Sequence, residues 1–172
     1  PQILDILDHY SAKATFFCIG TKLKESKKLA KEIIDRGHEI GNHSYYHERK
    51  FPIVSVKKMV KEINQTNELI TELTGNENTL FRPPFGITNP RIAKAVKITF
   101  MNVIGWNIRS FDTMNKIPTN VITKVTNQLK VGSVVLLHDD REKTPVILEG
   151  ILQYMQSRKL RSVTVSELFS FN

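Results

Sequence analysis

The chain has 172 residues, of which 40% are hydrophobic and 24% are charged, a composition typical of one globular domain with a sizeable core. The longest unbroken apolar runs, such as Val134–Leu137, fall far short of the roughly 20 residues of a membrane-spanning helix, and a single cysteine, Cys18, excludes an internal disulfide and a cysteine-based zinc site. The net charge of +8 would suit an anionic partner, but the lysines are spread over several amphipathic segments and no recognition motif accompanies them, so nucleic acid is not an expected partner.

Short apolar strands alternate with amphipathic helices along the chain, which is the pattern of an α/β fold. Apolar residues at helical spacing predict a helix in the opening segment, before the first strand. The expected strands are Ala14–Ile19, His38–Gly41, Thr79–Phe81, Thr99–Trp106, Ser133–Leu137 and Ser162–Val165. The further expected helices are Thr21–Arg36, Val54–Thr74, Pro90–Lys97, Pro118–Lys130 and Pro145–Arg158, followed by a terminal helical turn.

The opening helix has no strand in front of it. In a β/α barrel each helix follows its own strand, so this register predicts that one strand and its loop have been lost upstream of Pro1.

Two histidines, His43 and His47, follow the second expected strand. Imidazoles at positions i and i+4 of a helical turn point the same way and could coordinate one Zn²⁺-like ion, leaving positions for a carboxylate and water. An isolated pair at this spacing also occurs as ordinary surface histidines, so the spacing alone leaves both interpretations open.

A double proline, Pro83-Pro84, stops the third expected strand. Arg82 precedes it and Phe85-Gly86 follows it, so an arginine that can orient a carboxylate and a backbone N–H that can meet an oxyanion come from the same loop. The alternative is a stiff surface turn, because proline and glycine are ordinary loop residues.

A histidine, His138, ends the strand expected at 133–137. Imidazole titrates near neutral pH and suits a general acid, although a lone histidine after a strand is more often structural. All three signals follow the carboxyl ends of strands, the edge at which β/α folds keep their sites. Together they favour a functional site.

In this order and at these separations, the segments His43–His47, Arg82–Gly86 and Leu136–His138 resemble the second, third and fifth motifs of the polysaccharide deacetylase family, also called the NodB-like domain or carbohydrate esterase family 4. Supporting stretches are Lys13–Phe17 and Gly37–His43, and the resemblance spans nearly the whole chain. It implies an irregular (β/α) barrel of the seven-stranded deacetylase type. Residues 1–172 would form one such domain, N-terminally incomplete and without its first strand.

The resemblance assigns roles to residues of the first two matching motifs. His43 and His47 would hold a divalent metal, with Zn²⁺ as the first expectation and Co²⁺ or Ni²⁺ as alternatives. Arg82 would orient the catalytic base, and the backbone N–H of Phe85 would help to stabilise the oxyanion.

Three further residues receive roles in the same way, and Tyr46 is considered for its place beside the paired histidines. His138 would be the general acid, and Leu136 would line the pocket for the acetyl methyl group. Asp112 matches the second aspartate of the family's fourth motif and would tune His138. Tyr46 is expected to flank a sugar subsite, with a solvent-exposed loop aromatic as the equal alternative.

Two departures from the family pattern stand out. The first family motif, T-F-D-D-G-P, supplies the base aspartate and a metal-binding aspartate, and it does not occur within this sequence. In the fourth motif Arg109 replaces the first aspartate and Thr113 replaces the pocket tryptophan, which leaves the substrate preference open.

The resemblance implies metal-dependent hydrolysis of acetyl groups from a polysaccharide, with N-acetylglucosamine units of peptidoglycan or of a chitin-like polymer as the first expectation. The alternative is a catalytically inactive carbohydrate-binding or structural domain, because two histidines without carboxylates should bind metal weakly and lack a base. A bacterial protein that is secreted or associated with the cell envelope follows only from the family's usual substrates.

Overall fold

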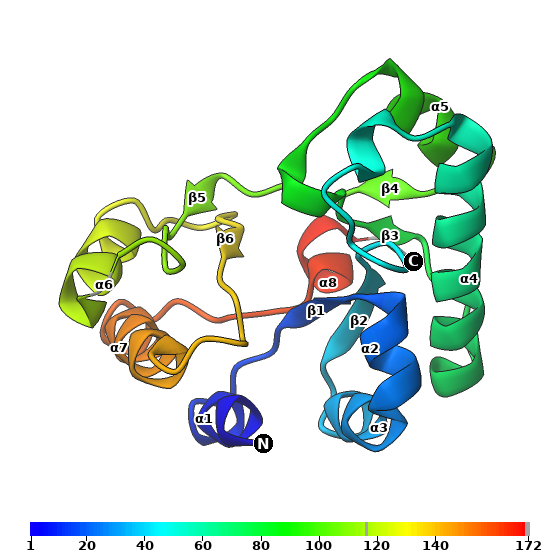
Figure 1. The fold of residues 1–172 in the computed structure, drawn as a ribbon. Helices are drawn as coiled ribbons and strands as arrows, with labels where there is room; N and C mark the ends of the chain where they lie inside the picture. Colours follow the sequence, from blue (N-terminus) through cyan, green and yellow to red (C-terminus); the bar gives the residue numbers. More distant parts are fainter. Residues whose placement is uncertain (116, 171–172) are drawn as a thin grey trace. The chain divides into compact units, whose positions relative to one another are not determined.

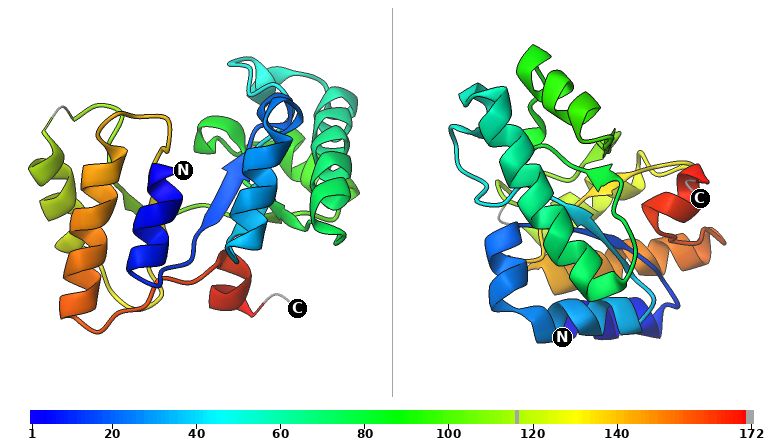
Figure 2. Two further views of the ribbon diagram at one scale, coloured as in Figure 1. Left: turned by 90° about the horizontal axis from the view of Figure 1, so that it is seen from below. Right: turned by 90° about the vertical axis from the view of Figure 1, so that its right-hand side faces the viewer.

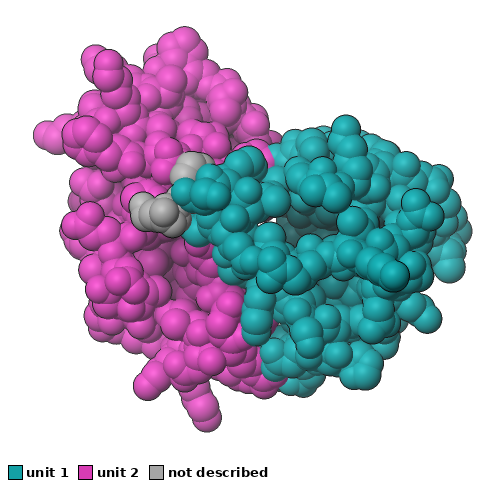
Figure 3. Space-filling model, turned by 180° about the vertical axis from the view of Figure 1, so that it is seen from behind, with its two compact units in different colours: residues 1–14, 106–172 teal, residues 15–105 magenta. Residues whose placement is uncertain are grey.

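The computed structural model describes residues 1–115 and 117–170. Contacts divide the chain into two units, one of Thr15–Gly105 and one of Pro1–Ala14 with Trp106–Asn172 (Figure 3).

The unit 15–105 contains a parallel sheet in the order β1-β2-β3-β4 (Figure 1). Its strands are β1 (Thr15–Cys18), β2 (Glu39–Asn42), β3 (Leu80–Phe81) and β4 (Asn102–Val103). Because neighbouring strands are parallel, their carboxyl ends meet at one edge of the sheet. The segments that follow β2 and β3, which carry His43 and Arg82, therefore lie at that edge.

Helices connect these strands and pack beside them. They are α2 (Gly20–Glu25), α3 (Lys27–Asp35), α4 (Val56–Thr74) and α5 (Pro90–Ile98), with short 3-10 helices η1 (Phe51–Ile53) and η2 (Pro84–Gly86). The ends of α4 are set locally, because Ser55 Oγ accepts the N–H of Lys58 and Gly75 ends the helix in the left-handed conformation. Helix α4 packs against β2 and thereby against the segment that follows it.

The core of this unit lies between α4, α5 and the middle of the sheet. Its buried members are Phe51, Met59, Ile63, Phe81, Ile92, Ala95 and Met101. Phe81, the last residue of β3, is fully buried and immediately precedes Arg82. The buried ring of Phe81 therefore anchors the end of β3, where the segment that begins with Arg82 leaves the sheet.

We expect Phe81→Ala to lower the free energy of unfolding by about 3–5 kcal/mol, because it removes a buried ring and leaves a cavity. Urea unfolding followed by circular dichroism measures the change. Phe100→Ala is the matched control: Phe100 is 87% exposed, so the loss of its ring should cost less than about 0.5 kcal/mol. Equal losses in the two variants would contradict this view of the core.

The unit of residues 1–14 and 106–172 contains a pair of parallel strands, β5 (Ile108–Arg109) and β6 (Val135–Leu136). Its helices are α1 (Gln2–His9), α6 (Pro118–Thr126), α7 (Thr144–Ser157) and α8 (Val165–Phe169). Helix α7 packs against both α6 and α1 (Figure 2). The buried cluster of this unit consists of Ile108, Val121, Val125, Ile147 and Ile151.

The α/β class and the opening helix are confirmed, and several predicted boundaries are wrong. The helix expected over 21–36 is two helices, because the backbone at Ser26 leaves the helical region. Residues 162–165 are not a strand; Ser162 exchanges hydrogen bonds with Lys13, and Thr164 caps α8. The segment 99–106 contributes only Asn102–Val103 to the sheet.

Parallel sheets of four and two strands are established for the described residues, whereas closure into a barrel and the single-domain organisation stay predictions. Across residues 1–115 and 117–170, none of the helices combines the length and the apolar character needed to cross a membrane.

Candidate functional site

The loop after β2 brings the rings of His43 and His47 together, with centroids 4.6 Å apart. His43 Nδ1 lies 2.7 Å from the carbonyl oxygen of Arg82. A carbonyl oxygen only accepts hydrogen bonds, so Nδ1 must carry the proton and Nε2 of the neutral ring carries the lone pair that a metal ion needs. Fixing the tautomer through the second ring nitrogen is the usual support of a metal-binding histidine.

The backbone of this loop is not the helical turn that the spacing suggested, and that prediction is wrong. Ser44 and His47 both have left-handed backbone conformations, with φ of 62° and 54°. The hydroxyl of Ser44 accepts the N–H of His47 at 3.1 Å and closes the turn. Such conformations cost free energy in residues other than glycine, so the surrounding contacts must hold the loop in place.

Arg82 follows β3 and is held rigidly at the edge of the sheet. Its Nε donates to the carbonyl of Ile104 and one terminal nitrogen to that of Gly105, both at 3.1 Å. The guanidinium lies 4.0 Å over the ring centre of Phe17. Burial lowers the pKa of Arg82 to about 10, so the side chain stays cationic at neutral pH. It is a fixed positive charge at this edge of the sheet, and the backbone carbonyl of Arg82 is the group that contacts His43.

Phe85 lies in the turn after the double proline, with a left-handed φ of 61°. Its ring contacts that of His47, with centroids 4.7 Å apart, and the residue is 47% exposed. The role of its backbone N–H at an oxyanion stays a prediction. In this unit the structure thus brings together His43, His47, Arg82 and Phe85.

Tyr46 projects from the same loop. Its side chain is half-exposed and makes an edge-to-face contact with Tyr45, at a centroid separation of 4.8 Å. This exposure suits a stacking surface for a sugar ring, and the subsite itself stays a prediction.

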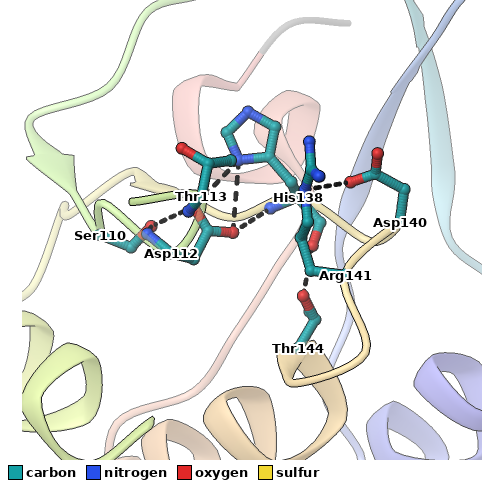
Figure 4. A network of polar contacts seen from close by, with 7 residues as sticks. All are labelled: Ser110, Asp112, Thr113, His138, Asp140, Arg141 and Thr144. Carbon is teal, nitrogen blue, oxygen red and sulfur yellow. Dashed lines mark hydrogen bonds and ion pairs between the residues drawn. The ribbon is translucent and has the colours of Figure 1, made fainter. Parts of the chain in front are cut away.

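A second polar cluster lies in the other unit, where Asp112 follows β5 and His138 follows β6 (Figure 4). Asp112 Oδ2 accepts the backbone N–H of His138 at 2.7 Å, and Oδ1 lies 3.0 Å from His138 Nδ1. Oδ1 also accepts from the hydroxyl of Ser110 and the backbone N–H of Thr113, both at 3.0 Å. The carboxylate is almost fully buried, whereas the imidazole is 43% exposed.

These contacts shift the pKa values of both Asp112 and His138. Burial raises the pKa of the Asp112 carboxyl, but the hydrogen bonds from the side chain and backbone of His138 outweigh it, so the pKa lies below its ordinary value. The hydrogen bond to Asp112 raises the pKa of His138 and exceeds the opposing effect of burial. Since Asp112 occupies the Nδ1 side, the opposite ring nitrogen, Nε2, is the one placed to give a proton away.

Neighbouring residues fix His138 and the strand below it. The hydroxyl of Thr144, at the start of α7, donates to the His138 carbonyl oxygen (Figure 4). Leu136 lies in β6 in register with Arg109 of β5. The guanidinium of Arg109 lies over the ring of Phe111, so this departure from the family pattern is engaged in a cation–π contact. The proposed roles of Leu136 and Asp112 stay predictions.

Sequence reasoning missed the residues that support these side chains. Ser110 and Thr144 were not assigned roles, and neither was Glu62, a buried carboxylate of α4 that accepts the backbone N–H of Tyr46. Ser110 could have been found from its place two residues before Asp112, because a hydroxyl at that spacing often bonds a carboxylate locally. Glu62 gives only a weak signal, a charge on the apolar face of an amphipathic helix.

Comparisons with known proteins show the family to which this chain is related. The sequence profile of the family described as polysaccharide deacetylase matches residues 1–104. A peptidoglycan-N-acetylglucosamine deacetylase of Bacillus cereus is 34% identical over 99% of this chain and 82% of its own length. The peptidoglycan-N-acetylmuramic acid deacetylase PdaC of Bacillus subtilis is 31% identical over 97% of this chain, which spans only 35% of that protein.

Solved structures give the same result. A structure of PdaC superposes with a TM-score of 0.90 at 30% identity, covering 98% of this chain and 82% of that one. A family 4 acetyl xylan esterase of Clostridium thermocellum, in complex with cobalt, gives 0.88 at 29% identity, with coverage of 98% and 82%. A family 4 pseudoenzyme of Bacillus anthracis gives 0.89 at 28%, with coverage of 98% and 59%. The chain belongs to the polysaccharide deacetylase family.

Proposed function

We propose that this chain carries out the metal-dependent removal of acetyl groups from a polysaccharide, with N-acetylglucosamine units of peptidoglycan or of a chitin-like polymer as the substrate. The observation that carries this proposal is the pair of imidazoles after β2, with His43 Nδ1 anchored on the Arg82 carbonyl. Family membership and relatives named as peptidoglycan deacetylases support the substrate class.

His43 and His47 are the residues that would hold the divalent ion, and their chemistry fits it. Two neutral imidazoles suit Zn²⁺ first and Co²⁺ or Ni²⁺ next, and cobalt is present in the related esterase. Within the described ranges, 1–115 and 117–170, no group of three or more His, Cys, Asp or Glu gathers at one point, so the pair is only part of a ligand set. When bound, the ion would polarise an acetyl carbonyl and make water more acidic.

The other assigned residues would act on the acetamide and its leaving nitrogen. Water adds to the carbonyl carbon, the C–N bond breaks, and the products are acetate and a free amine. His138 would donate its Nε2 proton to the departing nitrogen, while Asp112 holds Nδ1. Acetyl esters are an alternative substrate, in which the same proton would reach an alkoxide oxygen. The polymeric substrate points to action at the bacterial cell envelope or outside the cell.

The second candidate is an inactive domain that keeps the fold. It is favoured by the similarity to a family 4 pseudoenzyme and by Arg109 at a position where the family pattern has an aspartate. Such a domain would bind polysaccharide or serve a structural role without hydrolysing it.

Acetate release separates the two candidates. We expect the protein encoded in full by its gene to release acetate from acetylated chitooligosaccharides and from peptidoglycan when Zn²⁺ or Co²⁺ is supplied, and to stop when a chelator is added. The segment 1–172 alone, assayed in parallel, tests the expectation that it lacks a base. If the full protein with metal releases no acetate from either substrate but still binds them, the inactive-domain proposal replaces the first one.

A further inference from the structure

The loop that carries the paired histidines is bonded to several elements of its unit. Strand β1 and helix α2 hold it through backbone hydrogen bonds of 3.0 Å: His43 N to Cys18 O, Gly20 N to Ser44 O, and Thr21 N to Tyr45 O. Gly20 permits this approach, since a side chain there would clash with Tyr45 and Thr66. The start of the loop is therefore fixed by the backbone.

The second half of the loop depends on side chains. Glu62 of α4 reaches it, and its Oε2 accepts the N–H of Tyr46 at 3.3 Å. The amides of Tyr45 and Tyr46 both favour its charged form, although burial raises the pKa of Glu62 above its ordinary value. Asn42 supplies a second tie to the same helix, accepting the N–H of Ser44 and donating to the carbonyl of Ile63.

Burying the carboxylate of Glu62 costs free energy, because it removes a charge from water. Glu62 is only 2% exposed and lies on the buried face of α4, beside Met59, Ile63 and Thr66. An apolar side chain would pack there without the penalty of removing a charge from water. The largest compensating contact is the hydrogen bond from the loop, followed by the charge of Lys58. The backbone of that loop is strained at Ser44 and His47, on either side of the bonded amide.

We infer that Glu62 is a positioning residue for the paired-histidine loop: by holding the amide of Tyr46 it fixes the backbone between His43 and His47 and so keeps the two imidazoles at their separation. The inference rests on the proposed function, since that gives the loop its task of holding a metal ion. Carboxylates that orient metal-binding residues without touching the ion commonly affect metal affinity by 10–100-fold.

The test uses Glu62→Ala, with Glu62→Gln as the conservative rescue and Glu68→Ala, an exposed carboxylate of the same helix, as the matched control. The first measurement is made on the full protein without metal, by NMR of the histidine ring nitrogens and of amide exchange. We expect Glu62→Ala to mix the tautomers of His43 and to speed amide exchange in 44–47 at least about tenfold. The exchange of Ile40 and Phe81 in the sheet should hold steady, because this is a local opening.

Glu62→Gln keeps an oxygen acceptor and should restore both signals, while Glu68→Ala should match the unaltered protein. A Co²⁺ titration followed by visible absorption is the second measurement. We expect about 10–100-fold weaker binding and an altered spectrum for Glu62→Ala alone. Unchanged ring and amide signals in Glu62→Ala, or equal changes throughout residues 15–105, would overturn the inference. If the unaltered protein releases no acetate while the loop still responds as expected, the proposed function fails and the positioning role stands.

Discussion

Replacing His47 with alanine is expected to weaken Zn²⁺ or Co²⁺ binding by more than about 100-fold, because removing a ligand costs more than the 10–100-fold loss that follows from removing its supporting partner. Acetate release at limiting metal should fall with it. Isothermal titration calorimetry on the full protein measures the affinity. His43→Ala should have the same effect, since the structure brings the two rings to a centroid separation of 4.6 Å.

The control is His9→Ala, which removes an exposed histidine from α1, in the other unit. It should leave the affinity unchanged within about twofold, because His9 is an exposed helix residue that is not part of the paired-histidine loop. If His47→Ala binds Zn²⁺ as tightly as the unaltered protein does, the metal ligands lie elsewhere and the assignment of the loop is wrong. If His9→Ala weakens metal binding equally, the titration measures nonspecific binding of the metal to surface histidines.

The elements of the fold could largely be predicted because their signals are local. Periodic apolar residues located α4 and α5 within one or two residues, and Asn89 and Gly75 mark their ends. The break at Ser26 escaped prediction because Lys24 to Lys28 continue an amphipathic pattern through it. The lengths of the strands could not be predicted, because only the neighbouring strand decides which residues pair. In the segment 99–106 only two residues pair with β3.

The residues of the candidate site also fall into those that the sequence predicts and those that it does not. His43, His47 and His138 could be found because motif spacing and their position after strands are properties of sequence. The left-handed turn at Ser44 could not, since a hydroxyl bond across the loop selects it over a helical turn. Glu62 is 16 residues from Tyr46 and meets it only because α4 packs against β2. Contacts between elements create such support, and no local pattern encodes it.

Replacing Asp112 with asparagine is expected to lower kcat by about 100-fold or more and to move the basic limb of the pH profile toward acid. General acid catalysis contributes about 10²–10⁴-fold, and it needs His138 protonated. Activity therefore falls as pH rises through the pKa of His138. In the unaltered protein the hydrogen bond to Asp112 raises that pKa, so the fall comes above the ordinary value of 6.5. Without the carboxylate, burial is left to lower it. Rates of acetate release between pH 5 and 9 measure the shift.

The same pair links stability to pH, and the sign follows from the two shifts. The raised pKa of His138 gives stability that is fully present below pH 6.5 and is lost as pH rises through the folded pKa. The lowered pKa of Asp112 gives stability that is present above 3.8 and is lost as pH falls through its folded pKa. Asp112→Asn should therefore destabilise the protein more at pH 5.5 than at pH 9 in urea unfolding.

The control is Asp139→Asn, which removes an exposed carboxylate next to His138 and should change neither the pH profile of activity nor that of stability. A basic limb that stays in place in Asp112→Asn would show that a group other than His138 supplies the proton.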